Sequence, residues 1–338
     1  MTVKVAINGF GRIGRDTLRG WALQENPAYE IVCITGRNAS KIIDKHTHLF
    51  KYDSIYRKYP GTVEMVEGGF EVDGRMVHVI DGGNPIDMPW KELGVDIVIE
   101  STGQFKSKEE CQAHIDAGAK KVIITAPGKD EDISIVMGVN DEQYDPAIHN
   151  IISNASCTTN CLAPVTKVIL DNFGIKKGLM TTVHAYTNDQ KIHDYHHKDM
   201  RRARAAAENI IPTTTGAAKA VGKVIPEVAG IMTGMAMRVP VATGSIVDAT
   251  FEIEKSATKE EINAAMKKAA ETTMKGVLEY SEEDLVSTDI IGNSHSSIFD
   301  AQLTLVNGNL IKVISWYDNE WGYAQRVLDL TEKVAKAL

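Results

Sequence analysis

A glycine-rich turn close to the start of the sequence constrains the fold more than any other feature. The apolar run 3–7 has the composition of a buried β-strand, and the run 9–14 (GFGRIG) follows it at the start of an amphipathic stretch. Gly-x-Gly-x-x-Gly between a strand and a helix is the fingerprint of a dinucleotide-binding βαβ unit. A glycine-rich turn in a fold without a cofactor is the alternative, but the flanking strand and helix favour nucleotide binding.

Each residue of this run has its own physical role in such a site. Gly9 permits the tight turn, Gly11 lets the backbone approach a pyrophosphate, and Gly14 allows the helix to pack closely on the strand. Arg12 and Ile13 begin the predicted helix, whose first amides attract phosphate. These five residues are therefore candidate cofactor contacts.

The rest of the first half repeats the alternation of strand and helix. Short β-branched runs at 31–34, 95–100 and 121–124 are separated by stretches such as 107–118 with helical character. This order predicts parallel strands joined by crossover helices. Segment 61–80 alternates polar and apolar residues around glycine pairs and predicts an inserted hairpin.

The pattern changes from Asn150 onward. A segment rich in Ser, Thr and Cys opens a helix to about Asn172, the charged segment Tyr186–Asn209 predicts a long functional loop, and 325–338 has helical spacing. Longer strand candidates lie at 179–185, 235–241, 244–254, 301–306 and 310–316, and they favour a sheet covered by helices on one side. The predicted fold class is α/β, with a Rossmann-type dinucleotide-binding domain and an α+β catalytic domain whose sheet is mainly antiparallel.

Composition narrows the classes of partner. The 338 residues include 37 Lys and Arg against 45 Asp and Glu, a net charge of −8, so nucleic acid is not expected as a main partner. No apolar segment approaches the ~20 residues of a membrane span, and the first residues enter a strand pattern rather than a secretion signal. Four cysteines are too few for a disulfide scaffold. We therefore expect a cytoplasmic protein with reduced thiols and no membrane association.

The second predicted strand ends in the sequence ITGR at 34–37. An NAD site places a carboxylate about 20 residues after the glycine run to hold the adenosine ribose hydroxyls. Here Gly36 stands at that position and Arg37 follows, with Ser40 and Lys41 nearby as further donors. A 2′-phosphate would meet no repulsion and would find a cation, so the sequence predicts that NADP is accepted and favoured over NAD. Arg37 as a solvated loop residue is the alternative.

A cysteine and a histidine are the candidate catalytic pair. Cys157 stands where the helix of the second half begins, and the helix dipole there favours a nucleophilic thiolate. An inert buried cysteine is the alternative, which fits Cys161 better. His184, near the end of a β-type run, is the candidate base. A histidine with a structural hydrogen bond is the alternative at that position.

Other polar residues indicate an anionic substrate. Thr213–Gly216 precedes a helix and offers hydroxyls and amides, and Arg204 and Arg238 supply charge, so a phosphorylated substrate is indicated. The threonines could equally form a helix cap. Three histidines have spacings found among metal ligands, but no second ligand pair accompanies them and no metal site is expected. They are His193, His196 and His197.

Four motifs together resemble the phosphorylating glyceraldehyde-3-phosphate dehydrogenases. They are 7–15 (INGFGRIGR), 153–161 (SNASCTTNC), 232–240 (MTGMAMRVP) and 315–320 (SWYDNE). The resemblance spans nearly the whole chain. It implies a dinucleotide-binding domain formed by 1–156 and 319–338, and a catalytic domain formed by 157–318.

The resemblance also implies a reaction of glycolysis and gluconeogenesis. Glyceraldehyde 3-phosphate and inorganic phosphate give 1,3-bisphosphoglycerate, with hydride transfer to NAD(P). Cys157 attacks the aldehyde to form a thiohemiacetal and then a thioester, and His184 is its base. The implied substrate and phosphate contacts are Ser156, Thr158, Thr187, Arg204, Thr215, Gly216 and Arg238. The cofactor contacts are Gly9, Gly11, Arg12, Ile13, Gly14, Gly36, Arg37, Thr125 and Asn319, the last for the nicotinamide carboxamide.

The sequence departs from the family pattern at two places. Segment 239–245 reads VPVATGS where family members commonly continue with Pro-Thr-Pro-Asn-Val-Ser, and Tyr195-His196 stands where NAD-specific relatives often have Leu-Pro. In this family the loop reaches a neighbouring subunit's cofactor site, which implies a homotetramer. The second departure therefore also favours NADP, because polar groups at 195–196 can reach a phosphate bound in that site. An erythrose-4-phosphate dehydrogenase of the same family is one alternative function. A non-catalytic nucleotide-sensing regulator is another, and the presence of both Cys157 and His184 argues against it.

Overall fold

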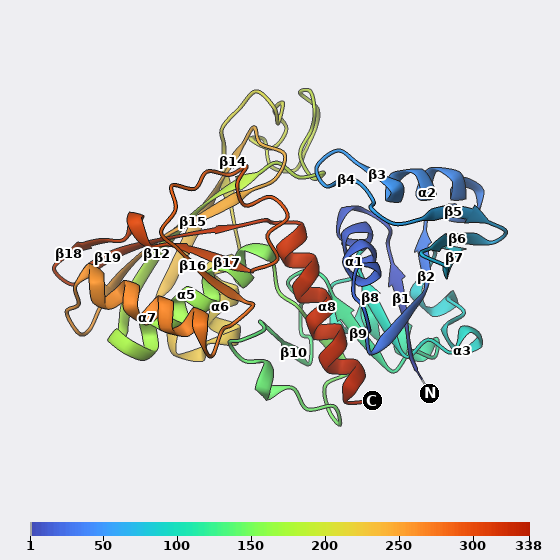
Figure 1. Cartoon of the computed structure of the whole chain (residues 1–338), viewed down its shortest axis with the longest axis horizontal. Helices are drawn as coiled ribbons and strands as arrows, with labels where there is room; N and C mark the ends of the chain where they lie inside the picture. The colour runs from blue at the N-terminus through green and yellow to red at the C-terminus, as the bar shows by residue number, and fades with distance from the viewer. Residues whose placement is uncertain (1) are drawn as a thin grey trace. The chain divides into compact units, whose positions relative to one another are not determined.

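The computed structural model describes residues 2–338, whose contacts divide the chain into two compact units (Figure 1). The first unit comprises the chain up to Ile135 together with Glu142–Ala155 and Ala324–Leu338. The second comprises Val136–Asp141 and Ser156–Tyr323. Each unit is built around its own large β-sheet.

The first unit holds a nine-stranded sheet in the order β10-β11-β9-β8-β1-β2-β7-β6-β5. Strands from β10 to β7 pair in parallel, and β6 and β5 add an antiparallel extension. The chain winds away from β1 in both directions, which is the doubly wound dinucleotide-binding arrangement and confirms the predicted fold class. The strands are β1 (Val3–Asn8), β2 (Tyr29–Gly36), β5 (Val63–Val66), β6 (Gly69–Val72), β7 (Arg75–Asp81), β8 (Ile97–Glu100), β9 (Lys121–Ile124), β10 (Ile133–Ser134) and β11 (Ile151–Ser153), with β3 (Tyr52–Asp53) and β4 (Arg57–Lys58) forming a separate ribbon.

Central strands of this sheet are apolar without alternation because both of their faces are buried. Residues 5–7 of β1 and 97–99 of β8 have no exposed surface, as expected for parallel strands covered on both sides. The predicted hairpin at 61–80 is confirmed as the β5-β6-β7 meander. The helices of this unit are α1 (Arg12–Ala22), α2 (Ile43–Lys51), α3 (Trp90–Leu93) and α4 (Lys108–Asp116), with short 3₁₀ turns η1 (Ala39–Ile42), η2 (Pro85–Asp87) and η3 (Asp141–Gln143), the last at the boundary of the units.

Local signals explain two of the helix positions. Ser107 caps α4 by accepting a hydrogen bond from the Glu110 amide, and Glu110 accepts from the Ser107 amide in return. The C-terminal helix α8 (Trp321–Lys336) confirms the predicted helix, although it begins four residues earlier. Its portion from Ala324 onward belongs to the first unit. There it packs against α1 at Gly20, where a Cβ would lie only 2.7 Å from Leu328 Cδ1.

The second unit holds an eight-stranded, mostly antiparallel sheet in the order β13-β14-β12-β15-β19-β17-β16, and β18 also pairs with β19. Two pairs, β12 with β14 and β16 with β17, are parallel. The strands are β12 (Ile175–Ala185), β13 (Ile211–Thr214), β14 (Met232–Val239), β15 (Ser245–Ile253), β16 (Leu278–Ser281), β17 (Ser297–Asp300), β18 (Leu305–Asn307) and β19 (Leu310–Tyr317). The other elements are α5 (Cys157–Phe173), α6 (Ala217–Val224), η4 (Pro226–Val228), α7 (Lys259–Glu271) and η5 (Ala301–Leu303).

Helices cover one face of this second sheet. The helix α5 contacts β12, β15, β17 and β19, and it is flanked by α6 and α7. Strand β12 shows the two faces clearly, because Met180, Thr182 and His184 are buried whereas Leu179 is 64% exposed. The predicted long loop at 186–209 lies between β12 and β13.

One predicted strand of the second unit is wrong. Residues 301–306 do not form a continuous strand, because the 3₁₀ turn η5 occupies 301–303 and only the following residues pair, as β18. Both β17 and β18 pair with β19, in the registers Phe299↔Ser315 and Leu305↔Lys312. The 3₁₀ turn η5 therefore interrupts the pairing with β19 between β17 and β18.

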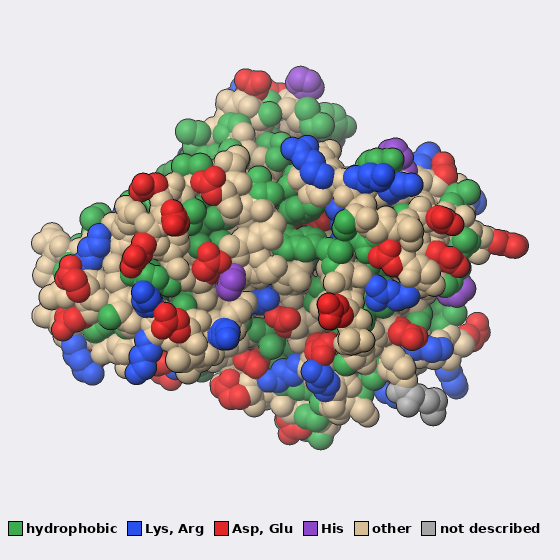
Figure 2. Space-filling view, viewed as in Figure 1, with side chains coloured by type: hydrophobic (Ala, Val, Ile, Leu, Met, Phe, Trp, Pro, Cys, Tyr) green, Lys and Arg blue, Asp and Glu red, His purple; other side chains and the backbone are tan. Residues whose placement is uncertain are grey.

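Two surface properties complete the description. None of the helices found among residues 2–338 has the length and apolar character needed to cross a bilayer. On the face drawn in Figure 2, basic and acidic side chains are interspersed rather than gathered by sign.

Candidate active site and dinucleotide site

The nucleophile candidate lies at the first position of α5. Ala155, two residues earlier, has a positive φ of 54°, which L-residues with a Cβ seldom adopt. This sharp turn is followed by Ser156, whose hydroxyl caps the helix by accepting from the Thr159 amide at 3.1 Å. Cys157 is therefore held at a helix start with intermediate exposure, whereas Cys161 one turn later is fully buried.

The second unit brings Cys157 and His184 together. The Sγ atom of Cys157 lies 3.5 Å from Nε2 of His184 at the end of β12. The other ring nitrogen, Nδ1, lies 2.7 Å from the Ala185 carbonyl oxygen and 2.7 Å from Nη1 of Arg238. Arg238 reaches this position because β12 and β14 pair in a register that places it directly beside His184.

These contacts allow two tautomers of His184 with different chemistry. If Nδ1 carries the proton and donates it to the Ala185 carbonyl, Nε2 is free to accept the proton of Cys157. If Arg238 donates to Nδ1, the proton sits on Nε2 and points at the sulfur. The first tautomer is the one a general base requires, and in it Nδ1 cannot accept from Arg238, which donates only to the Ala185 carbonyl, at 2.9 Å.

Burial controls the charge of this pair. Desolvation lowers the pKa of His184 to about 3, and the charge of Arg238 acts in the same direction. Desolvation also raises the pKa of the Cys157 thiol, while Arg238 and the hydrogen bonds of Thr158 oppose that shift. Burial and the helix terminus therefore act in opposite directions on the pKa of the Cys157 thiol, whereas the imidazole of His184 is neutral at neutral pH.

A buried tyrosine connects the strands behind this pair. The hydroxyl of Tyr317 lies 2.9 Å from the Thr158 hydroxyl and 2.8 Å from the Thr182 hydroxyl. Its ring meets the His184 ring edge-on, with centroids 5.9 Å apart. Tyr317 thus ties the helix of Cys157 to the strand of His184, a contribution that the sequence analysis missed.

Asn319 is oriented by a second small network. Its Oδ1 accepts a hydrogen bond from the Ser245 hydroxyl at 2.8 Å, and Ser245 in turn accepts from the Ala185 amide at 3.1 Å. Asn319 is only 4% exposed. Because its oxygen is engaged, its amide group is left as a donor, which suits recognition of a carboxamide oxygen.

The predicted phosphate contacts are only partly brought together. Arg238 and Thr158 lie beside the Cys157–His184 pair, as described above. At the start of α6, the Thr215 hydroxyl accepts from the Ala217 amide at 3.2 Å and Gly216 precedes the helix. Thr187 begins the long loop, where its amide donates to Gln190 at 3.3 Å.

The loop arginine near the pair is Arg202 rather than Arg204. The Arg204 side chain is 61% exposed and pairs with Asp194 at 2.9 Å. By contrast, Arg202 donates from Nε to the Thr213 hydroxyl at 2.9 Å and pairs with Asp189 at 2.7 Å. Its charge also acts on the pKa of His184. The sequence offers three arginines in 201–204 with no signal to choose among them, and the contacts of Arg202 make it the stronger candidate.

The glycine run of the first unit fits the predicted dinucleotide role. Gly9 has a φ of 102°, and a Cβ there would lie 2.6 Å from the Thr102 amide nitrogen. A Cβ on Gly14 would overlap the Gly9 carbonyl oxygen, whereas a Cβ on Gly11 would meet nothing within 4 Å. The helix α1 starts directly after Gly11, which carries no side chain to cap it. The close packing and the open backbone at the helix start are what a bound pyrophosphate needs.

Other predicted cofactor residues have definite surroundings. Arg12 forms an ion pair with Asp53, and Ile13 follows it in the first turn of α1. Thr125 follows β9 and donates from its hydroxyl to the Glu100 carbonyl at 3.1 Å. Gly36 ends β2, and Arg37 after it is exposed.

A buried carboxylate beside the glycine run, that of Glu100, was not predicted from the sequence. Glu100, at the end of β8, accepts from Asn8 Nδ2 at 2.6 Å and from the Thr102 amide at 2.8 Å. His114 Nε2 lies 3.2 Å from the same carboxylate, and its Nδ1 accepts from Trp90 Nε1 at 2.9 Å. Asn8 directly precedes Gly9, so Glu100 ties the end of β8 to the end of β1, where the glycine turn begins.

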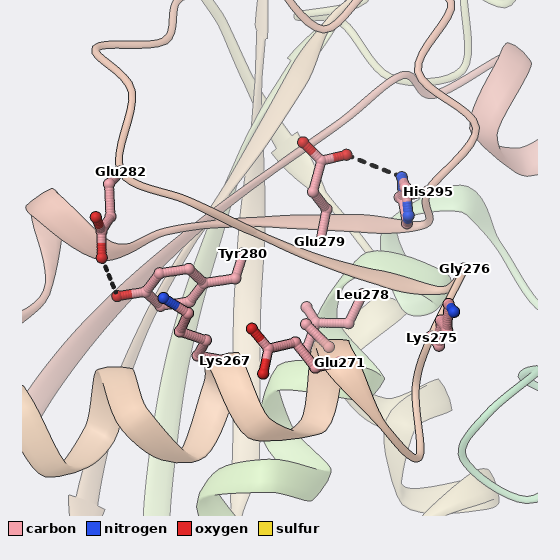
Figure 3. Close-up of a pocket in the computed structure, with 10 residues that line it drawn as sticks. Lys267, Glu271, Lys275, Gly276, Leu278, Glu279, Tyr280, Glu282 and His295 are labelled. Carbon is pink, nitrogen blue, oxygen red and sulfur yellow. Dashed lines mark hydrogen bonds and ion pairs between the residues drawn. The ribbon is translucent and has the colours of Figure 1, made fainter.

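A separate cavity of about 380 Å³ lies beside α7 and β16. The Tyr280 hydroxyl donates a hydrogen bond to Glu282 at 3.0 Å, and His295 pairs with Glu279 at 2.9 Å (Figure 3). Lys267 lies over the Tyr280 ring. The lining contains none of the predicted site residues, so we assign this cavity no part in the reaction.

Comparison with known proteins agrees with this geometry. Residues 3–108 match the model of the glyceraldehyde 3-phosphate dehydrogenase NAD binding domain, and 156–319 match that of the C-terminal domain. The chain is 55% identical over 340 residues to the glyceraldehyde-3-phosphate dehydrogenase of Streptomyces coelicolor, covering all of both chains. The chain belongs to the glyceraldehyde-3-phosphate dehydrogenase family. The enzyme of Geobacillus stearothermophilus is also 55% identical, over 338 residues and 99% of each chain, and glyceraldehyde-3-phosphate dehydrogenase 1 of Bacillus subtilis is 54% identical over 337 residues, also covering 99% of each chain.

Membership confirms the resemblance inferred from the motifs and the enzymatic function. The chain is an NAD(P)-dependent oxidoreductase of glycolysis, and the erythrose-4-phosphate and regulator alternatives are not favoured.

Proposed function

We propose that this chain oxidises glyceraldehyde 3-phosphate to 1,3-bisphosphoglycerate, with Cys157 as nucleophile and His184 as general base. The observation that carries this proposal is the 3.5 Å contact between Cys157 Sγ and His184 Nε2 at the start of a helix, next to Arg238. A thiol with a neutral imidazole in reach is the arrangement of covalent catalysis.

The steps follow from these groups. His184 Nε2 takes the thiol proton as Cys157 Sγ bonds to the aldehyde carbon and returns it to the former carbonyl oxygen, so the product is a neutral thiohemiacetal. The glycine run would hold NAD(P)⁺, which when bound would supply the acceptor for the hydride. His184 removes the hydroxyl proton as the carbon is oxidised to a thioester. An oxygen of inorganic phosphate then attacks the thioester carbon, the C–S bond breaks, and the acyl phosphate leaves while the sulfur takes the proton held by His184, which restores the Cys157 thiol.

Positive charge supports a substrate and a second reactant that both carry phosphate. Arg238 and Arg202 are two cations close to His184, and Thr158 and Thr215 offer hydroxyls. Charge-assisted hydrogen bonds of this kind select phosphate over neutral groups. Ser156, Thr187 and Gly216 complete the proposed set, in which Arg202 takes the place that the sequence analysis expects for Arg204.

The decisive experiment replaces the nucleophile. Cys157→Ser should abolish oxidation of glyceraldehyde 3-phosphate while the dissociation constants of NAD⁺ and NADP⁺ stay near those of the wild type, because a serine hydroxyl is far less acidic than a thiol. Cys161→Ser is the matched control, since that thiol is buried and its pKa is raised to about 12. Appreciable turnover by the Cys157 variant would contradict the assignment. Wild-type activity on erythrose 4-phosphate above that on glyceraldehyde 3-phosphate would favour the alternative function of an erythrose-4-phosphate dehydrogenase.

For the cofactor, we propose that NADP is accepted beside NAD and is favoured. Gly36 leaves room at the strand end, since a Cβ there would find its nearest atoms at 3.5 Å, and Arg37 is exposed next to it. Catalytic efficiency with each cofactor, in the wild type and in Gly36→Asp, tests the proposal. A strong wild-type preference for NAD⁺ would refute it.

We further propose a homotetramer that acts in the cytoplasm. The open face of the second sheet exposes apolar side chains, including Leu179 at 64%, Leu305 at 60% and Leu310 at 48%, and a hollow of about 300 Å³ lies among Leu179, Ile231 and Leu310. Apolar patches of this kind mark protein interfaces. Cys33, Cys111, Cys157 and Cys161 are free thiols, which suits a reducing compartment. Light scattering should give four times the chain mass, and a monomer would refute the assembly.

A further inference from the structure

The end of β2 lacks the carboxylate of an NAD site, but the neighbouring strand supplies one. In the parallel pair of β2 and β7, Gly36 stands directly beside Asp81. The two strand ends are tied together by the Gly82 amide, which donates to the Gly36 carbonyl at 2.7 Å. Parallel strands bind ligands at their carboxyl ends, so Asp81 lies on the same edge of the sheet as the glycine run at the end of β1.

Two hydrogen bonds hold this carboxylate in place. The Ser40 amide donates to Asp81 Oδ1 and the Ser40 hydroxyl donates to Oδ2, each at 2.8 Å. These bonds lower the pKa of Asp81, and Lys41 acts in the same direction. Asp81 is therefore ionised at neutral pH, and it is exposed at the strand end.

The pairing changes the meaning of the nearby donors. The sequence makes Ser40 a candidate donor for a 2′-phosphate, but its amide and its hydroxyl both donate to Asp81. A 2′-phosphate bound beside Gly36 would be repelled by the negative charge of Asp81. A ribose hydroxyl there could instead donate a hydrogen bond to the Asp81 carboxylate.

We propose that Asp81 limits the preference for NADP at this site, as a second carboxylate beside the position where Gly36 lacks one. Asp81 accepts a hydrogen bond from an adenosine ribose hydroxyl, opposes a 2′-phosphate, and keeps Ser40 from donating to that phosphate. Gly36 and Arg37 favour NADP and Asp81 limits that preference. The inference rests on the proposed use of NAD(P) by this chain.

The test measures cofactor binding directly, without aldehyde, by calorimetry on the full chain with NAD⁺ and with NADP⁺. In Asp81→Asn, the ratio of the NADP⁺ to the NAD⁺ association constant should rise about tenfold, the scale of one exposed contact between like charges at about 4 Å when the phosphate carries more than one charge. The rise should shrink at high salt. Glu92→Gln, which removes an exposed carboxylate on α3, is the matched control and should leave the ratio unchanged.

A second substitution tests the part played by Ser40. If Ser40 is released to the phosphate when Asp81 is neutralised, the gain in NADP⁺ binding should be smaller in the double variant Ser40→Ala/Asp81→Asn than in Asp81→Asn alone. An unchanged ratio in Asp81→Asn, or an equal change in Glu92→Gln, would overturn the proposal. Asp81→Ser serves as a second variant if the asparagine form melts below the wild type. Failure of aldehyde oxidation would leave these binding ratios unaffected, so the two proposals can fail separately.

Discussion

The buried His184 should make the stability of this protein depend on pH in a measurable way. Its pKa is lowered to about 3 by burial and by the charge of Arg238, whereas in an unfolded chain it is about 6.5. Between these values the unfolded state binds a proton at this residue and the folded state does not. Stability from this residue is therefore fully present above about pH 6.5 and is lost as the pH falls toward 3.

The magnitude follows from the same two values. One proton corresponds to a limiting slope of about 1.4 kcal/mol per pH unit, and over the whole window the contribution reaches about 5 kcal/mol at most. His184→Gln removes the titrating group and keeps a polar side chain. We expect the free energy of unfolding of this variant to fall less steeply with acidification than that of the wild type, by about 1 kcal/mol per pH unit between about pH 4 and 6.

Urea unfolding followed by circular dichroism at several pH values measures this slope. His78→Gln is the control, because His78 is exposed on β7 and its removal should leave the slope unchanged. Carbon-13 labelling of the histidine rings gives an independent readout, since the His184 resonance should not titrate above about pH 4. Equal slopes in the wild type and His184→Gln, or an NMR midpoint near 6.5, would refute the reasoning.

Three further results are expected. Arg202→Ala should lose about 10- to 100-fold in kcat/KM for phosphorylated aldehyde and far less for unphosphorylated glyceraldehyde. The control Arg204→Ala, which loses only an exposed ion pair, should stay near the wild type, and equal losses on both aldehydes in Arg202→Ala would make Arg202 structural. Glu100→Gln should raise the calorimetric dissociation constant of both cofactors about tenfold with kcat preserved, because one of the hydrogen bonds that hold the glycine turn is lost; an unchanged constant would remove Glu100 from the site. Ser107→Ala should cost about 1 kcal/mol of unfolding free energy through the lost cap of α4 while cofactor affinity stays unchanged, and a change in affinity would contradict a purely structural cap.

Elements with strong local signals were predictable from the sequence. The strand–glycine–helix unit at 3–22 was recognisable because each glycine meets a steric demand, and residues 5–7 are apolar because both faces of β1 are buried. The strand predicted at 301–306 was wrong because local signals do not show how this segment pairs with its neighbour. Its composition is that of a strand, but five residues (300–304) stand against only two of β19 between the paired positions, and nothing in composition records such an excess.

The parts of the site that the sequence did not reveal are fixed by strand register. His184 meets Arg238 because β12 and β14 pair residue for residue at those positions, 54 residues apart in the chain, and Gly36 meets Asp81 in the same way between β2 and β7. The rule that places a carboxylate at the end of the second strand describes one chain segment, whereas a ligand at a sheet edge meets the ends of all neighbouring strands. A charge can therefore move from one strand end to the next while staying beside the same ligand atoms. Because Gly36 and Asp81 are register partners, we expect the effect of the missing carboxylate at position 36 on cofactor preference to depend on the charge at position 81.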